Sequence, residues 1–221
     1  MVNLFFILSG FVITHNYYSK VRNIKDLSKF LILRIGRLYP LHLVFLIIFL
    51  IYEVAKYVAV SYFEFSNSIQ PFSINSSSNF VANLLLVHSF GFTESSFNGP
   101  SWSISAEFYT YILFALLLIM STKRFFLYSF FIVVAALSIL NFSSYTSGLL
   151  LCVIGFFMGV LTYWSYIRLS QIKNYSVINN LTSIIVALTF CYLSLKTPFE
   201  NDILSFAIFP FMILFIVLSN N

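Results

Sequence analysis

Two arginines three positions apart could bind a phosphate group. Arg34 and Arg37 precede Pro40 in the sequence Arg-Ile-Gly-Arg-Leu-Tyr-Pro. On a helix the two arginines share a face, so both guanidinium groups could reach one phosphate through paired hydrogen bonds. Pro40 is expected in the first turn of the next helix, where proline is tolerated. The alternative is that both arginines only anchor that helix at lipid phosphates.

A carboxylate near the start of an apolar segment could take part in acid–base chemistry. Glu107 follows Trp102 and Ser103 in the sequence Trp-Ser-Ile-Ser-Ala-Glu-Phe-Tyr, which ends at Tyr109. On a helix Ser103 and Glu107 share a face, and Glu107 lies about 7 Å inside the segment. An ionisable side chain at that depth is costly unless it is paired or faces water, so it predicts a functional site. The alternative is a Glu that only caps or pairs with a neighbouring helix.

Three histidines could carry protons. His88 is expected near Glu107, where the pair could act as general acid and base. His42 lies one turn into an apolar segment, and His15 is expected at the membrane interface. The alternative for each is a hydrogen-bonded packing residue. The sequence has no metal-ligand spacing, Ser-His-Asp motif or phosphate-binding glycine loop, so no metal is predicted.

Small residues near the start of the chain could let another group approach the backbone. Ser9 and Gly10 lie in the sequence Asn-Leu-Phe-Phe-Ile-Leu-Ser-Gly-Phe. Such residues are typical of close helix contacts in lipid, and the alternative is that a substrate chain passes beside Gly10. The candidates for substrate binding are Ser9, Gly10, Trp102 and Tyr109.

The elements that position these residues must lie in a membrane. Of the 221 residues, 60% are hydrophobic, 20% aromatic and 9% charged, whereas soluble domains have about 25% charged residues. Membrane lipid is therefore an expected partner. The net charge of +5 is explained by the excess of basic residues in the cytoplasmic loops of membrane proteins. No nucleic-acid partner is therefore predicted. The oligomeric state stays open.

Eight apolar blocks occur along the chain, and about 20 residues are needed to cross a bilayer. Blocks 4–14 and 80–90 are too short and predict short or re-entrant segments. The fold class expected is all-α, a polytopic transmembrane helix bundle with about six full spans. The predicted spans are 38–60, 102–120, 125–140, 145–166, 181–195 and 203–218.

Charge in the connecting segments predicts the orientation. Segment 15–37 carries six basic residues and one acidic residue, which places it in the cytoplasm by the positive-inside rule. The later basic residues fall on the same side only if block 80–90 does not cross. Arg34 and Arg37 are then expected at the inner end of one route through the bilayer, and Glu107 at its outer end.

Three motifs, in this order, resemble those of the acyltransferase family 3 integral membrane proteins, which include O-antigen and exopolysaccharide O-acetyltransferases. The first is the motif that contains Ser9 and Gly10, and the second is Arg-x-x-Arg-x-x-Pro. The third is Trp-Ser-x-x-x-Glu-x-Tyr. The resemblance extends to Phe114, and the later segments agree only in hydropathy.

The resemblance implies a helix bundle, in the inner membrane of bacteria, that takes an acyl group from acyl-CoA, usually acetyl-CoA, in the cytoplasm. It also implies that the acyl group passes to a hydroxyl of a carbohydrate on the outer side. Arg34 and Arg37 match a basic pair that holds the phosphates of coenzyme A. Trp102, Ser103 and Glu107 match a motif near the outer mouth, where the carboxylate could orient a catalytic imidazole or the acceptor hydroxyl.

The chain departs from the family pattern at its start. Family members carry an Arg and a His on a helix ahead of the first motif, and that His is expected to be the catalytic base. Residues 1–221 are therefore expected to form one partial acyltransferase domain that lacks the first and last helices and is inactive by itself. The alternatives are a transporter or flippase component, with Glu107 on the substrate path, and an inactive truncated product.

Overall fold

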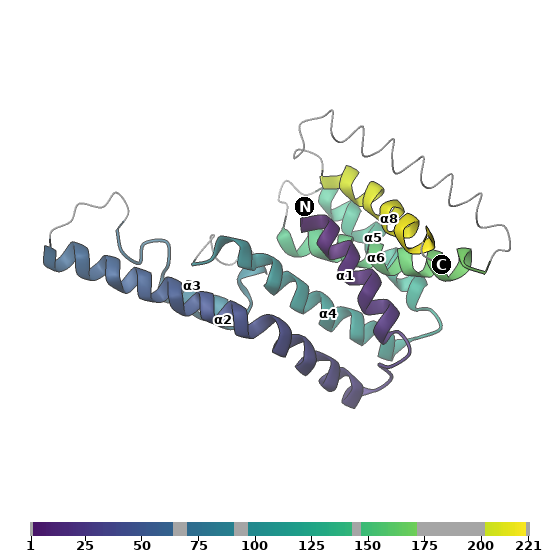
Figure 1. The fold of residues 1–221 in the computed structure, drawn as a ribbon, viewed down its shortest axis with the longest axis horizontal. Helices are drawn as coiled ribbons and strands as arrows, with labels where there is room; N and C mark the ends of the chain where they lie inside the picture. Colours follow the sequence, from purple (N-terminus) through teal and green to yellow (C-terminus); the bar gives the residue numbers. More distant parts are fainter. Residues whose placement is uncertain (1, 64–69, 91–96, 143–146, 172–201, 220–221) are drawn as a thin grey trace. The chain divides into compact units, whose positions relative to one another are not determined.

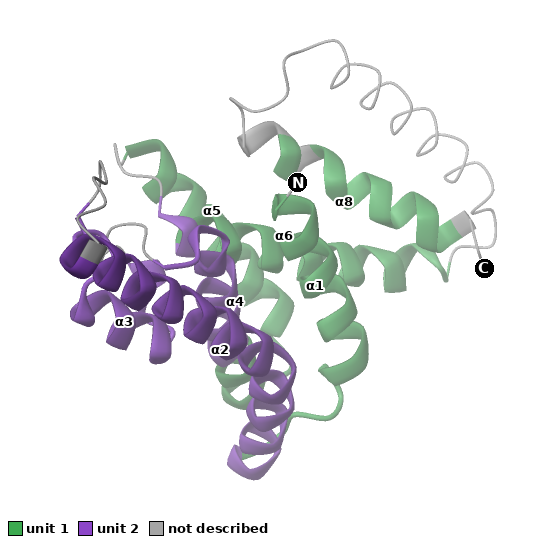
Figure 2. Ribbon diagram, turned by 60° about the vertical axis from the view of Figure 1, so that its left-hand side comes forward, with its two compact units in different colours: residues 1–23, 114–146, 150–221 green, residues 24–113, 147–149 purple. Residues whose placement is uncertain are grey.

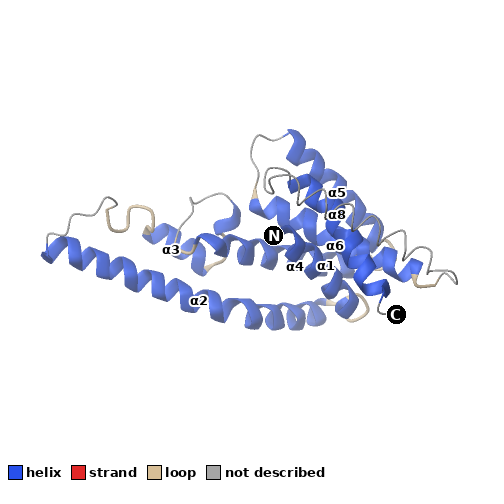
Figure 3. Ribbon diagram, turned by 45° about the horizontal axis from the view of Figure 1, so that its top comes forward, coloured by secondary structure: helices blue, strands red, loops and turns tan. Residues whose placement is uncertain are grey.

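All regular secondary structure in the described part of the chain is helical. A computed structural model describes residues 2–63, 70–90, 97–142, 147–171 and 202–219, and no strand occurs in these ranges (Figure 3). This confirms the all-α prediction. The helices are α1 Val2–Tyr17, α2 Ile24–Phe63, α3 Ser77–Leu84, η1 His88–Phe90, η2 Gly99–Ser101, α4 Trp102–Met120, α5 Phe125–Phe142, α6 Gly148–Leu169 and α8 Asp202–Ser219.

Four helices of the described chain are long and apolar enough to cross a membrane. They are α2, α4 with η2 before it, α5 and α6, so four of the six predicted spans are present. The described apolar part of α8 is shorter, and block 181–195 lies outside the described residues. Block 80–90 does not span, because the eight residues of α3 rise only about 12 Å, against about 30 Å of hydrocarbon.

Helix α2 is longer than the sequence indicated. Figure 1 shows it as one uninterrupted helix, and its 40 residues rise about 60 Å. Four of the six basic residues of segment 15–37, from Lys25 onward, are part of this helix and not of a loop. The expected place of Pro40 in a first turn is therefore wrong, because Pro40 lies well inside α2. A proline there removes one backbone hydrogen bond, a loss that long membrane helices tolerate.

The chain divides into two compact units, shown in different colours in Figure 2. Unit 1 comprises residues 1–23, 114–146 and 150–221, and unit 2 comprises residues 24–113 and 147–149. Helix α4 contributes residues 102–113 to unit 2 and residues 114–120 to unit 1. Each unit is described below by itself.

Unit 1 is held together by close contacts of α1 with α6 and α8. A Cβ atom at Gly10 would overlap the carbonyl oxygen of Phe156, and one at Gly159 would overlap that of Ile7. Glycine at both positions therefore lets the backbones of α1 and α6 touch, which is how helices associate in lipid. Against α8, the Asn3 side-chain amide donates a hydrogen bond of 2.8 Å to Ser205.

Replacing Gly159 by Ala is expected to destabilise unit 1 by about 1–3 kcal/mol, because the added methyl group must displace the α1 backbone. The matched control is Gly36→Ala on α2, where a Cβ would meet nothing within 4 Å. The control should be neutral or gain about 0.5–1 kcal/mol from its lower chain entropy. Thermal unfolding of the purified protein in detergent measures both. Equal melting temperatures for the two variants would contradict the contact between α1 and α6.

Candidate active site

Arg34 of α2 lies against two aromatic rings in unit 2. Its guanidinium carbon is 5.4 Å from the ring centre of Phe30 and 5.7 Å from that of Tyr111. The two rings meet edge to face, with their centres 5.9 Å apart. Both distances are within the range of cation–π contacts. A guanidinium group held against aromatic rings can still direct N–H groups at a phosphate.

Arg37 has a different environment from Arg34. It is exposed on α2, whereas Arg34 is half-buried. The two residues are close along the helix, but only Arg34 packs on Phe30 and Tyr111. The sequence analysis did not distinguish the two arginines. In the structure, only the side chain of Arg34 is held in place by these aromatic contacts.

Glu107 and Tyr111 form a buried pair on α4. Their side chains are one turn apart, and the Tyr111 hydroxyl donates a hydrogen bond to Oε1 of Glu107. Both residues are almost completely buried, at 3% and 4% exposure. Because the guanidinium of Arg34 lies over the Tyr111 ring, Arg34, Tyr111 and Glu107 form one continuous series of contacts between α2 and α4.

This series corrects the expected separation of Arg34 and Glu107. The sequence placed them at opposite ends of a route through the bilayer, yet one tyrosine side chain links them. The reason is the length of α2. Because α2 begins at Ile24, Arg34 lies nearly three turns inside the helix and not at its entrance.

Two histidines, one buried and one half-buried, stack on each other in the same unit: His42 is 1% exposed, and His88 is intermediate in exposure. The rings of His42 and His88 are nearly parallel, at 8°, with their centres 5.8 Å apart. Nε2 of His42 is 3.0 Å from the backbone oxygen of Asn83. That oxygen can only accept, so Nε2 carries the hydrogen. Nε2 of His88 is 3.2 Å from Oγ of Ser101.

The hydrogen bonds of Ser101 indicate which nitrogen of His88 is basic. The Ser101 hydroxyl is 2.7 Å from the backbone oxygen of Asn98 and donates its only hydrogen there. It therefore accepts from Nε2–H of His88, which leaves Nδ1 with the lone pair. Among the described residues, Nδ1 of His88 is buried and has no hydrogen-bond partner, and the same holds for Nδ1 of His42.

The environment of His88 favours its neutral form. Burial is the largest influence and lowers the pKa of His88 below the ordinary value of 6.5. The nearby His42 lowers this pKa further, and hydrogen bonding to Ser101 and to the backbone of Ala82 opposes both effects. A half-buried neutral imidazole can accept a proton from a hydroxyl group.

The structure does not form the predicted pair of His88 and Glu107. His88 contacts Ser101 and His42 instead. The segment that carries His88 lies level with the first residues of α4, as the 2.7 Å hydrogen bond between Ser105 and Ser89 shows. Glu107 accepts a hydrogen bond from Tyr111, one turn further along α4.

The remaining predicted residues on α4 have structural contacts. The Ser103 hydroxyl donates a 3.0 Å hydrogen bond to the backbone oxygen of Pro100 at the start of the helix. The Trp102 ring covers Gly148, where a Cβ would overlap it. Tyr109 meets the ring of Phe90 edge to face at 4.7 Å.

Ser9 and Gly10 lie in unit 1. Ser9 is half-buried. At Gly10, the backbone of Phe156 takes the space that a substrate chain would need. The contact therefore favours helix packing as the role of Gly10.

Sequence reasoning missed Glu53. This residue lies deep in α2 with 3% exposure and accepts hydrogen bonds from Lys56, from the Phe72 backbone and from Asn75, at 3.0, 2.9 and 2.8 Å. These hydrogen bonds hold the loop before α3 against α2. A Glu and a Lys three positions apart inside an apolar block are a signal that could have identified it.

A strained turn precedes His88. Leu86 has a φ of 57°, a left-handed conformation that side chains other than glycine rarely adopt. Its amide donates to the Asn83 oxygen at 3.1 Å, and its own oxygen accepts from the Ser105 hydroxyl. Such backbone costs about 1–3 kcal/mol and is typical of functional sites. The turn ends α3 and leads into η1, which carries His88.

Comparison with known proteins identifies the family of the chain. The model of the acyltransferase 3 family, described as an acyltransferase domain, matches residues 1–221. No curated protein and no solved structure gave a significant match. The match covers the whole chain, and four helices of the described ranges are long and apolar enough to cross a bilayer. The chain is a multi-pass membrane protein that belongs to acyltransferase family 3.

Proposed function

We propose that the protein transfers an acyl group, acetyl in the first instance, from acyl-CoA to a hydroxyl of a cell-surface carbohydrate such as O-antigen or exopolysaccharide. The observation that carries this proposal is the acyltransferase family match over residues 1–221. A bacterial inner membrane would separate such a donor from such an acceptor, which explains why the enzyme is a membrane protein.

In this proposal Arg34 and Arg37 bind the phosphates of coenzyme A. Arg34 is supported by its packing on Phe30 and Tyr111, which fixes a guanidinium group before the donor arrives. Preorganisation lowers the entropic cost of binding. Arg37, exposed on the same helix, contributes a second charge that solvent screens more strongly.

In this proposal His88 is the general base, in place of the histidine that the family resemblance implies ahead of the first motif, so residues 1–221 are proposed to be active. Nδ1 of His88 takes the proton of the acceptor hydroxyl as its oxygen attacks the carbonyl carbon of the thioester. The new C–O bond forms, the C–S bond breaks, and coenzyme A leaves as a thiolate that takes up the proton. The hydrogen bond from Nε2 to Ser101 keeps the ring in the required tautomer.

Glu107 and Ser103 complete the proposed site, with Trp102 and Tyr109 lining the path of the acceptor. The buried carboxylate of Glu107 is held by Tyr111, and a carboxylate in this position can orient the acceptor hydroxyl.

Glu107→Gln is expected to lower acetylation of the surface glycan at least about tenfold, because a neutral amide orients a hydroxyl less strongly than a carboxylate does. Mass spectrometry of glycans from cells that express each variant measures this. The control is Asp26→Asn, an acidic residue at the start of α2. Unchanged acetylation in Glu107→Gln would remove its role. A substrate that crosses the membrane without gaining an acetyl group would instead support a transporter.

A further inference from the structure

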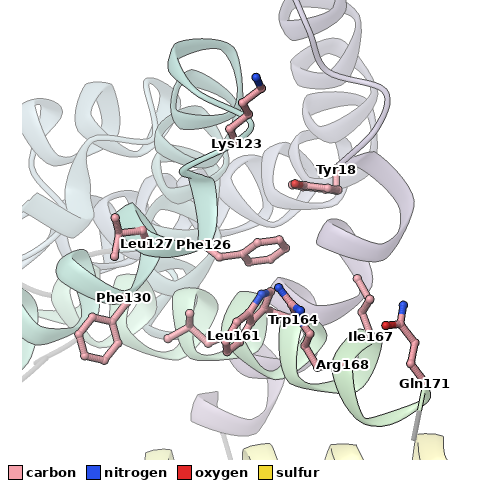
Figure 4. A pocket seen from close by; sticks show the side chains of 10 residues that line it. All are labelled: Tyr18, Lys123, Phe126, Leu127, Phe130, Leu161, Trp164, Ile167, Arg168 and Gln171. Carbon is pink, nitrogen blue, oxygen red and sulfur yellow. The ribbon is translucent and has the colours of Figure 1, made fainter.

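A groove of about 660 Å³ opens on unit 1, apart from the residues proposed for acyl transfer. Its walls come from three places: the turn after α1, the start of α5 and the end of α6 (Figure 4). The first residues of α5 and the last residues of α6 lie at the same end of the unit. The groove therefore begins at the ends of the helices and continues along their sides.

The groove is cationic at one end and apolar at the other. Lys123 lies just before α5, and Arg168 lies in the last turn of α6. Phe130 and Leu161 lie deeper, with Leu161 about 10 Å from Arg168 along the helix. No carboxylate is among the described residues that line the groove. This polarity matches a molecule with an anionic head and a hydrocarbon chain.

Aromatic side chains form the boundary between the two ends. The guanidinium carbon of Arg168 is 5.6 Å from the ring centre of Trp164. Phe126 lies 6.3 Å from Trp164 and 5.1 Å from Tyr18, measured between ring centres. Tryptophan and tyrosine are enriched at the level of lipid headgroups. The apolar wall is open, because Phe130 and Trp164 are 51% and 41% exposed.

We propose that this groove binds one anionic phospholipid of the cytoplasmic leaflet. Lys123 and Arg168 would contact the phosphate, and one acyl chain would follow Leu127, Phe130 and Leu161. Basic pockets between membrane helices at the cytoplasmic side bind anionic headgroups. The positive-inside rule assigns this end of unit 1 to the cytoplasm, since both basic residues lie there.

Quenching of tryptophan fluorescence by brominated lipids tests the proposal. The chain has two tryptophans, so in Trp102→Phe only Trp164 reports, from inside the groove. The protein is placed in vesicles that contain brominated phosphatidylglycerol or brominated phosphatidylcholine. Binding at Trp164 should favour phosphatidylglycerol about fivefold or more, the effect of one basic residue near a phosphate. When Lys123→Gln and Arg168→Gln are added to Trp102→Phe, the ratio of phosphatidylglycerol binding to phosphatidylcholine binding should fall close to one.

The matched control is Lys25→Gln with Lys29→Gln, which removes the same charge from α2 and should keep the preference. Thermal unfolding shows whether each variant is folded, and native mass spectrometry of co-purified lipid gives an independent readout in the wild-type protein. Equal quenching by both lipids would overturn the proposal. Loss of the preference in the control, or displacement of phosphatidylglycerol by added acetyl-CoA, would also overturn it.

Discussion

His88→Gln is expected to lower the rate of acyl transfer by about 10²–10⁴-fold, the usual contribution of a general base. Glutamine can still donate to Ser101, which lies 3.2 Å from Nε2 of His88, but it cannot accept a proton. The change should therefore reduce kcat and leave KM for acetyl-CoA nearly unchanged. Initial rates of acetyl transfer by the purified protein measure both constants.

The pH dependence of the rate gives a second readout for His88. Only the neutral imidazole accepts a proton, so the wild-type rate should fall as the pH drops through the pKa of His88. Burial lowers that pKa below 6.5, so the acid limb should lie below pH 6.5 and should vanish in His88→Gln. The control is His15→Gln, an exposed histidine on α1. A normal rate or an unchanged acid limb in His88→Gln would show that another group is the base.

Arg34→Ala is expected to weaken the binding of acetyl-CoA about tenfold or more, the value of one hydrogen bond to a charged group. Arg34→Lys should not restore binding, because an ammonium group lacks the planar donors that stack on Tyr111 and meet a phosphate. Arg37→Ala should have a smaller effect, since Arg37 is exposed. Isothermal titration calorimetry with acetyl-CoA measures the three variants.

The control for Arg34 is Lys29→Ala, which removes one exposed positive charge from the same helix. Both variants remove one positive charge from α2, so a general loss of positive potential should weaken binding equally in both. A specific contact of Arg34 should weaken it only in Arg34→Ala. Equal weakening in Lys29→Ala and Arg34→Ala would contradict the assigned role of Arg34.

The positions of the long helices could be predicted from the sequence because each apolar block must satisfy its own backbone in lipid. Helix α4 begins at Trp102, as predicted, directly after the short helix η2 that contains Pro100. The eight residues of α3 agree with the prediction that block 80–90 does not cross. The length of α2 could not be predicted from the apolar block 38–60, because the helix begins at Ile24, before that block. Leu, Lys and Arg are good helix formers, so the helix continues outside the apolar block.

Contacts between side chains of different helices could not be predicted. Whether Arg34 meets Tyr111, or His88 meets His42, depends on how each helix is rotated about its axis. The weak amphipathic patterning of membrane helices leaves that rotation open, because lipid-facing and buried residues are both apolar. The left-handed turn at Leu86 also could not be predicted, because no sequence pattern indicates a leucine with positive φ.

Transfer of radiolabelled acetyl groups tests the central claim most directly. The purified protein is placed in sealed proteoliposomes, with labelled acetyl-CoA on one side and a polysaccharide acceptor present. The account predicts label in ester linkage to the polysaccharide with the wild-type protein, and a loss of most of it with Arg34→Ala, Glu107→Gln or His88→Gln. Label that enters the polysaccharide equally in the wild type and all three variants would contradict the account, as would a wild-type protein that binds acetyl-CoA and transfers no label.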